Sequence, residues 1–264
     1  MAANPKSMQF LTHAKTFVRD AELPAARGVT RGEAPVGDQS PFDAAKQQAA
    51  VVGSDVISFV KEITPELRKD IVNSTLLAQL VANKKVQDPQ DLDGVLAWYK
   101  EYFNVLSQVG FVVQESGFAE YQEKSDSFEA HEAILDVVKV VLAGAPAALA
   151  IAVKTLESLK KLDADSPWIS LFHRESRSAN TARFQLSLAD SDPNGAFLSL
   201  LAFGIMAKSS VTQVLFFRFK KHESKLHHNS AKLTPNDTVL AGVREDIATK
   251  IAKFTRDFVA GLDI

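Results

Sequence analysis

The sequence contains no cysteine among its 264 residues. This absence excludes disulfides, a cysteine nucleophile, cysteine-bound metal and thioester acylation within the chain. Cysteine-free chains occur in the cytosol and also among products exported without disulfides. The first residues lack a basic region followed by an apolar run, the pattern of a classical signal peptide. We therefore expect a cytoplasmic protein or one exported by a leaderless route.

The sequence also lacks an excess of either charge. It has 30 lysines and arginines against 32 aspartates and glutamates, a formal net charge of −2. This balance gives no electrostatic reason to expect a nucleic-acid partner or attraction to an anionic membrane. A hydrophobic content of 46% and a charged content of 23% are typical of a globular chain. The length suits one large domain or two small ones.

Catalytic and nucleotide-binding motifs are missing as well. The chain shows no P-loop, dinucleotide fingerprint, kinase motif, calcium loop or Gly-x-Ser-x-Gly elbow. His131, in FEAHEAIL, resembles the start of a zinc-protease helix, but Leu135 stands where the second histidine belongs. We expect a helix-surface histidine there, and a solvated loop for His222, His227 and His228. The sequence thus predicts no enzyme, no cofactor and no metal site.

One arrangement keeps an enzymatic alternative open. His173, in LFHRESRS, has Glu175, Ser176 and Ser178 close by in the sequence. A serine, a histidine and an acid can form a catalytic triad when the fold brings them together. The alternative is an esterase-type hydrolase that uses His173.

The chain divides by composition into a short leading part and one domain. Residues 5–20 have the apolar spacing of a short helix, and residues 21–41 are rich in glycine, proline and alanine, which is typical of a flexible linker. We interpret 1–41 as helix plus linker and 42–264 as a single α+β domain. Its helical part covers 42–163, and a sheet with a C-terminal helix covers 164–264.

Helix starts are marked by a capping residue followed by proline. Proline at the first helical position loses nothing by its missing N–H, and a nearby carboxylate favours the helix dipole. This pattern predicts helices at about 41–62, 64–83, 88–108 and 234–262, opened by Ser40-Pro41, Thr64-Pro65, Asp88-Pro89 and Thr234-Pro235.

The second half changes to the two-residue period of strands. Residues 182–190 alternate, with Phe184, Leu186 and Leu188 on one face and Arg183, Gln185 and Ser187 on the other. The sequence predicts an antiparallel sheet of about four strands, at 167–175, 182–190, 196–207 and 211–221, with a further extended run after Gly110. The fold class is therefore α+β: a helical N-terminal half, then the sheet, then a long C-terminal helix.

A long stretch with few charges covers 133–162, AILDVVKVVLAGAPAALAIAVKTLESLKKL. A capping box of Asp126 and Glu129 predicts a helix to about residue 143, Gly144-Ala145-Pro146 breaks it, and a second helix follows to about residue 162. The run without charge, Val140 to Val153, has fourteen residues. As a straight helix it spans roughly 21 Å, against about 30 Å for a bilayer core. We expect no integral membrane protein in the resting state.

Two interpretations of this helical hairpin stay open. Its many small residues suit a buried corner that packs closely against its neighbours. Alternatively, the hairpin is a concealed membrane-active element or the wall of a lipid pocket. In the second case the expected lipid or membrane contacts are Val141, Leu142, Ala145, Leu149 and Ile151.

Four pieces of the chain carry a family resemblance: AWYKEYFNVLSQVGFVVQESGFAEY, SFEAHEAIL, VLFFRFK and the late helix after LTPND. Over roughly residues 40–260 they resemble a bacterial family of mostly uncharacterised proteins associated with the Evf-type virulence factor of insect-infecting enterobacteria. The resemblance implies a protein without known enzymatic activity, linked to persistence or toxicity in an insect host. It also implies membrane association through a fatty acid on a central cysteine.

The chain departs from that family at this cysteine, because it has none. The acyl attachment therefore maps to no residue here, which leaves an apolar pocket for a free acyl chain, or membrane contact by side chains alone. The resulting expectation is a non-enzymatic bacterial virulence or toxin-like protein, with lipid or a membrane surface as partner. The alternatives are a soluble interaction or structural protein with 133–162 as plain core, and the hydrolase. The expected location is the bacterial cytoplasm or outside, after export without a classical signal peptide.

Overall fold

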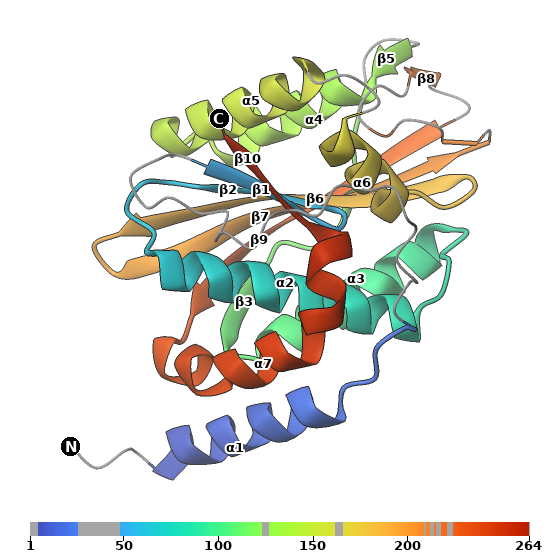
Figure 1. The fold of residues 1–264 in the computed structure, drawn as a ribbon. Coiled ribbons are helices and arrows are strands. Elements are labelled where there is room, and N and C mark those ends of the chain that lie inside the picture. Colours follow the sequence, from blue (N-terminus) through green and yellow to red (C-terminus); the bar gives the residue numbers. More distant parts are fainter. Residues whose placement is uncertain are drawn as a thin grey trace.

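The fold is a mixed sheet between two helical layers (Figure 1). The computed structural model describes residues 5–25, 48–122, 127–161, 166–208, 210–211, 214, 218–220 and 224–263. In Figure 1, α4, α5 and α6 lie above the sheet, α2, α3 and α7 lie below it, and α1 lies beyond α7. The helices in the described residues are α1 (Pro5–Asp20), α2 (Pro65–Lys85), α3 (Leu92–Gln108), α4 (Ala130–Val141), α5 (Pro146–Lys161), α6 (Pro167–Ser176) and α7 (Asp237–Phe258).

The strands form one large sheet and one short ribbon. The large sheet has the order β10-β1-β2-β6-β7-β9-β3, and β4 also pairs with β9, while β5 and β8 form the ribbon. All pairs are antiparallel except β2 with β6. The strands are β1 (Gln48–Val52), β2 (Asp55–Phe59), β3 (Phe111–Glu115), β4 (Ala119–Glu120), β5 (Ser127–Glu129), β6 (Thr181–Asp192), β7 (Gly195–Ala207), β8 (Arg218–Lys220), β9 (Ser224–Pro235) and β10 (Val259–Asp263).

The expected α+β class is confirmed, as are several of its elements. Thr64 caps α2 through its hydroxyl, which accepts a hydrogen bond from the backbone N–H of Leu67. In α3 the cap is Asp91 rather than the expected Asp88, and its carboxylate accepts from the N–H of Gly94 at 2.8 Å. The strand pair predicted at 182–190 and 196–207 is β6 with β7.

The helix predicted at 41–62 is wrong. Residues 48–59 form the hairpin β1–β2, and residues 41–47 lie outside the described part of the chain. The turn contains Gly53 at φ +57, a left-handed conformation that glycine adopts without the strain of a side chain. The flanking residues are rich in valine and isoleucine, which favour strands, and β2 finds a parallel partner in β6.

The strand predicted at 167–175 is also wrong, because these residues form α6. Ser166 caps this helix by accepting a hydrogen bond from the N–H of Ile169, and Pro167 lies at the helix start. This is the same capping pattern that the sequence shows before α2. Here Ile169, Leu171 and Phe172 form the buried side of a short helix rather than one face of a strand.

The sheet is larger than the four antiparallel strands expected from the sequence. The predicted C-terminal helix at 234–262 ends at Phe258, and the chain continues as β10, which pairs with β1. Of the strand predicted at 211–221, the structure describes only Val211, Val214 and β8. The extended run after Gly110 is β3, at the edge beyond β9.

The core has two parts, one on each face of the sheet. The part between the sheet and the helices α2, α3 and α7 contains the stacked rings of Trp98 and Tyr102, with centroids 5.3 Å apart. The part between the sheet and the helices α4, α5 and α6 contains the stacked pair Phe184 and Phe203, with centroids 4.9 Å apart. Together the two parts enclose the central strands from both sides.

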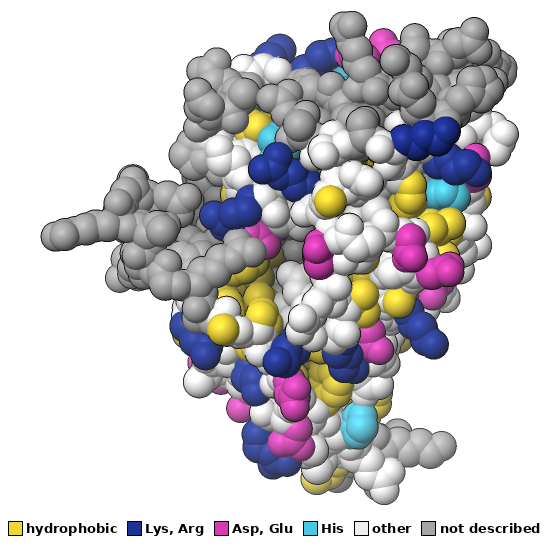
Figure 2. All heavy atoms as spheres, turned by 90° about the vertical axis from the view of Figure 1, so that its right-hand side faces the viewer, with side chains coloured by type: hydrophobic (Ala, Val, Ile, Leu, Met, Phe, Trp, Pro, Cys, Tyr) yellow, Lys and Arg dark blue, Asp and Glu magenta, His cyan; other side chains and the backbone are white. Residues whose placement is uncertain are grey.

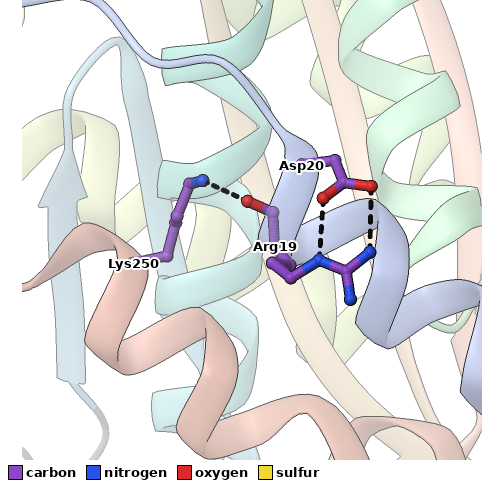
Figure 3. Close-up of polar contacts among 3 residues, drawn as sticks. All are labelled: Arg19, Asp20 and Lys250. Atoms are coloured by element: carbon purple, nitrogen blue, oxygen red, sulfur yellow. Dashed lines mark hydrogen bonds and ion pairs between the residues drawn. The ribbon is translucent and has the colours of Figure 1, made fainter.

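The first helix packs on the outer side of α7. Ala14 and Val18 of α1 are fully buried there, and Leu11 lies against Gly242, where a Cβ would meet its side chain at 2.4 Å. Figure 3 shows the polar contact at the end of α1, where the ammonium group of Lys250 donates to the backbone carbonyl of Arg19 at 2.7 Å. The linker residues 21–25 follow, and 26–41 lie outside the described residues.

Candidate functional site

The apolar stretch folds as the expected pair of helices. α4 and α5 form a hairpin that is part of the upper layer in Figure 1, joined through Leu142–Ala145. The turn is closed by a hydrogen bond from the N–H of Ala145 to the carbonyl of Leu142 at 2.9 Å. The capping box expected at 126–129 is wrong, because Ser127–Glu129 form β5 and Glu129 makes no side-chain cap bond.

One face of this hairpin is core. Its inner residues pack against β6 and β7 and are buried, which matches the interpretation of a close-packed corner for this face. The buried set includes Ile134, Val138, Leu142, Leu156 and Leu159.

The other face exposes apolar side chains at the bend. Val140 is 77% exposed and Val141 is 38% exposed, two of the few large hydrophobic residues of the described chain that reach the surface. The small residues of the bend, Ala143, Gly144, Pro146 and Ala147, are exposed as well. This surface, residues 140–147, is called the apolar bend below.

The five contact residues expected from the sequence are therefore divided by the fold. Val141 is exposed, Ala145 and Leu149 are half-buried, and Leu142 and Ile151 are buried in the core. The uncharged run in the sequence located the segment. Only the packing of the two helices shows which of its residues are exposed and which are buried.

Little space remains between the hairpin and the sheet. A cavity of about 20 Å³ lies there, bounded by Leu142, Leu156, Leu186 and Leu201 among others. This volume holds about one water molecule, whereas pockets for small ligands measure roughly 300–1,000 Å³. No acyl chain fits under the hairpin in this conformation.

An open cleft runs beside the apolar bend. It has a volume of about 380 Å³ and lies between Val141 and Leu142 of the hairpin and the strands β7, β9 and β3. The strands line it with polar residues such as Gln114, Ser199, Ser230 and Lys232, and also with the apolar residues Leu200, Leu201 and Ala231. Its lining is therefore mixed, with apolar groups from both the hairpin and the strands.

The histidines do not form a metal site within the described residues. His131 is buried in α4 rather than exposed on a helix surface, and burial, followed by the charge of Lys160, lowers its pKa. The expectation of a solvated loop is wrong for His227 and His228, which lie on β9 where it pairs with β4. His222 lies outside the described residues.

His173 is placed on α6 and buried. Its Nδ1 accepts a hydrogen bond from the backbone N–H of Val214 at 3.1 Å, and its Nε2 has no partner among the described residues. Burial, with the nearby charge of Arg177, lowers the pKa of His173 to about 4, so the ring is neutral at pH 7. Ser178 donates instead to Asp88. The described residues thus form no serine–histidine–acid chain around His173.

The polar face of β6 carries a network that sequence reasoning missed. Arg183, Gln185 and Ser187 share one face, as the alternation predicts, but this face is covered by α2 and α3 and is buried. Gln185 accepts from the hydroxyl of Ser54 at 3.1 Å and donates to the hydroxyl of Tyr99 at 3.1 Å. The alternation of apolar and polar residues predicts that these three side chains share a face. No local pattern in the sequence indicates that helices cover this face.

A second polar feature opens at the end of this network. A cleft of about 280 Å³ is lined by Arg174 and Arg177 from the end of α6, by Arg183 of β6 and by the loop between α2 and α3. We call it the arginine cleft. Nothing in the sequence marked it, because its residues come from separate parts of the chain.

Comparison with known protein families and with curated proteins finds no match for this chain. Three solved structures show a weak likeness. A delta-endotoxin has a TM-score of 0.34 and 11% identity, over 81% of this chain and 91% of that one. The activated Cyt2Ba monomer from Bacillus thuringiensis subsp. israelensis has a TM-score of 0.38 and 10% identity, over 69% and 97%. The Evf virulence factor has a TM-score of 0.31 and 9% identity, over 82% and 85%.

The Evf-type resemblance seen in the sequence is thus matched by a weak structural likeness. TM-scores of 0.31–0.38 at 9–11% identity establish neither a shared family nor a shared activity. The case for a function depends on the surfaces described above.

Proposed function

We propose that this protein is a non-enzymatic, toxin-like protein that contacts lipid bilayers through the apolar bend of the α4–α5 hairpin. The observation that carries the proposal is the exposure of Val140 and Val141 inside a run of fourteen residues without charge. The virulence role, and action on an insect host, are the context that the sequence resemblance implies.

The chemistry of the bend favours a lipid surface over a protein partner. Protein interfaces are enriched in aromatic residues and arginine, whereas the bend offers valine, alanine, glycine and proline. The run is flanked by Lys139 and Lys154, both exposed, whose ammonium groups suit the headgroup region of a bilayer. Aliphatic residues between lysines are typical of a segment that lies in the interface.

The depth of the contact is limited by the helix lengths. No helix in the described part of the chain is long and apolar enough to cross a membrane. Interfacial segments bury their apolar face by roughly 5–10 Å. We therefore expect the bend to enter the headgroup and upper acyl region while the rest of α4 and α5 stays on the sheet.

The binding energy of such a contact is small. Full burial of one exposed valine stabilises by about 1.5 kcal/mol or more, so the two valines give roughly 2–3 kcal/mol. A single myristoyl chain, a larger apolar group, gives only marginal and reversible binding. Binding by one hairpin is therefore weak and reversible, and requires vesicles in excess.

The test is flotation of the purified protein with vesicles of phosphatidylcholine, with and without phosphatidylglycerol. Val140→Asp places a carboxylate at the most exposed position of the bend and should lower the partition coefficient about tenfold. Met8→Asp is the matched control, because Met8 is 58% exposed on α1, on the opposite side of the sheet.

Two results would contradict the proposal. One is the absence of wild-type protein from the floated fraction at every lipid composition, which leaves the soluble interaction protein as the better interpretation. The other is equal binding of the wild type and Val140→Asp, which places the contact elsewhere. The fold of each variant is checked by its melting temperature.

A further inference from the structure

The arginine cleft is a polar hollow formed by segments that are distant in the sequence. It is bounded by the end of the α1 segment at Pro24 and Ala25, the α2–α3 loop, the end of α6, the start of β6 and the end of α7. None of its lining residues belongs to the α4–α5 hairpin. It is therefore independent of the membrane contact proposed above.

Arg183 is the central group of this cleft. Its side chain is buried, its guanidinium carbon lies 4.5 Å from the centre of the Trp98 ring, and its Nη2 donates to the side-chain carbonyl of Asn83. The indole N–H of Trp98 donates to the same carbonyl at 2.7 Å, so that oxygen is already shared. The Nε of Arg183 is buried without a hydrogen-bond partner among the described residues.

A buried guanidinium with an unmet donor is unfavourable by itself. A buried charge is stable when it is paired and when its donors are satisfied, and an unsatisfied buried donor costs roughly 1–3 kcal/mol. Burial is strong enough to lower the pKa of Arg183 to about 10. The Nε of Arg183 therefore lacks an acceptor among the described residues, and Arg183 is one of the residues that line the cleft.

The lining of the cleft carries more positive than negative charge. The lining contains the three arginines at 174, 177 and 183 and two carboxylates, Asp88 and Glu175. Arg174 donates to Glu175 at 2.8 Å, while Asp88 accepts from Ser178 and Gln90. On the face drawn in Figure 2, basic and acidic side chains are interspersed.

The walls of the cleft are held in fixed positions by contacts between distant segments. Asp88 has φ +47, which is uncommon for a residue with a side chain, and its carboxylate ties the α2–α3 loop to Ser178 after α6. The hydroxyl of Thr181 donates to the carbonyl of Pro89 at 2.6 Å. Strained backbone that is held by its surroundings is frequent at ligand sites, where it keeps the binding groups in place.

We infer that the arginine cleft binds a small phosphate-bearing ligand, whose oxygens accept hydrogen bonds from Arg183, with Arg177 at the rim. Guanidinium groups match the geometry of phosphate oxygens and bind them in pairs of parallel hydrogen bonds. The volume of about 280 Å³ accepts a phosphate with a small organic group. Phe254 and Phe258 of α7 also line the cleft and offer that group an apolar contact.

The first experiment is thermal denaturation of the full chain with increasing inorganic phosphate, with sodium chloride added to keep the ionic strength constant. We expect a saturable rise of the melting temperature for the wild type. Arg177→Gln removes an exposed cation, so it should preserve the fold and raise the apparent Kd for phosphate about tenfold. Lys139→Gln removes an exposed cation from α4 and should leave the Kd unchanged.

Arg183→Lys is the second variant, because it keeps the charge but removes Nε and the planar donor pair. If the site acts as proposed, this variant loses the phosphate response by about tenfold or more while its melting temperature without phosphate stays measurable. A phosphate response that is absent in the wild type, or that has the same Kd in Arg177→Gln and Lys139→Gln, would overturn the inference.

The phosphate could belong to a soluble molecule or to a lipid headgroup, and vesicles containing phosphatidic acid distinguish these sources. Flotation that free phosphate competes away, and that Arg177→Gln weakens but Val140→Asp does not, indicates a headgroup. Flotation that is independent of phosphate and of Arg177 indicates a soluble ligand. Failure of the membrane proposal leaves the phosphate titration unaffected, because the two sites share no residue.

Discussion

Asp55 is a carboxyl group enclosed in the centre of the sheet. It is fully buried, its Oδ2 accepts from the hydroxyl of Ser187 at 2.9 Å, and its Oδ1 has no partner among the described residues. The side chains near it that titrate are the phenols of Tyr99 and Tyr102 on α3. Burial therefore raises the pKa of Asp55 to about 7, above the ordinary value of 3.8, against the smaller opposite effect of its hydrogen bonds.

This shift predicts a loss of stability as the pH rises. Between pH 4 and pH 7 the folded state keeps the proton on Asp55 while the unfolded state has released it, so the free energy of unfolding falls with pH across that window. Asp55→Asn replaces the protonated acid by a neutral amide. We expect this variant to be more stable than the wild type at pH 8, by up to about 4 kcal/mol.

The measurement is urea denaturation of both proteins at pH 5 and pH 8. The wild type should lose more stability between these values than the variant does. Asp93→Asn is the control, because Asp93 is an exposed carboxylate in the first turn of α3. Parallel pH profiles of the wild type and Asp55→Asn would show that the carboxyl is ionised in the folded protein throughout.

At the scale of elements, a buried residue and an exposed residue are neighbours in the α4–α5 hairpin. Leu142 is buried against β6 and β7, while Val141 is exposed. Leu142→Ala should lower the free energy of unfolding by roughly 2–4 kcal/mol, because it removes buried methyl groups and leaves a cavity. Val141→Ala should change it by less than about 0.5 kcal/mol. Chemical denaturation measures both, and similar losses would mean that the bend is packed in solution.

The sequence predicted helices well where the cap and the apolar face agreed. Thr64-Pro65 before α2 is an example, since a capped helix with one apolar face needs few distant partners. The helix α3 also forms where it was predicted, although its cap is Asp91 and not Asp88. The strand prediction at 167–175 overlooked a local signal, the cap Ser166-Pro167. The failure at 41–62 has a different cause. β1 pairs with β10 and β2 pairs with β6, more than 100 residues away in each case, so no local pattern contains the contact that decides the structure.

The two candidate sites also differ in whether the sequence could locate them. The apolar run that includes Val140 and Val141 is continuous in the sequence, so composition alone located it. The arginine cleft is assembled from the α1 segment, the α2–α3 loop, α6, β6 and α7, which lie far apart in the chain. Gly53-Ser54 between valine-rich runs was a hairpin signal that the helix prediction overlooked.

At the scale of the whole molecule, the described segments nearest to the two ends of the chain pack against the rest of the fold. β10, at the C-terminal end, forms the sheet edge beside β1, and α1, near the N-terminal end, covers α7. α2 and α7 are joined inside the same layer by Arg244, which donates two hydrogen bonds of 2.7 Å to the carboxylate of Asp70. The sheet and the helices other than α1 thus have their own core, and α2 and α7 are joined by hydrogen bonds that do not involve α1.

This arrangement predicts that α1 separates from the rest without unfolding it. Ala14 is fully buried between α1 and its neighbours, so Ala14→Asp places an unpaired charge in that contact. We expect the amides of α1 to lose hydrogen-exchange protection by about tenfold or more, while those of β6 and β7 stay protected. Met8→Asp, on the exposed side of the same helix, should change neither. Equal loss of protection in α1 and in the sheet would instead show that α1 and the α+β domain unfold as one cooperative unit.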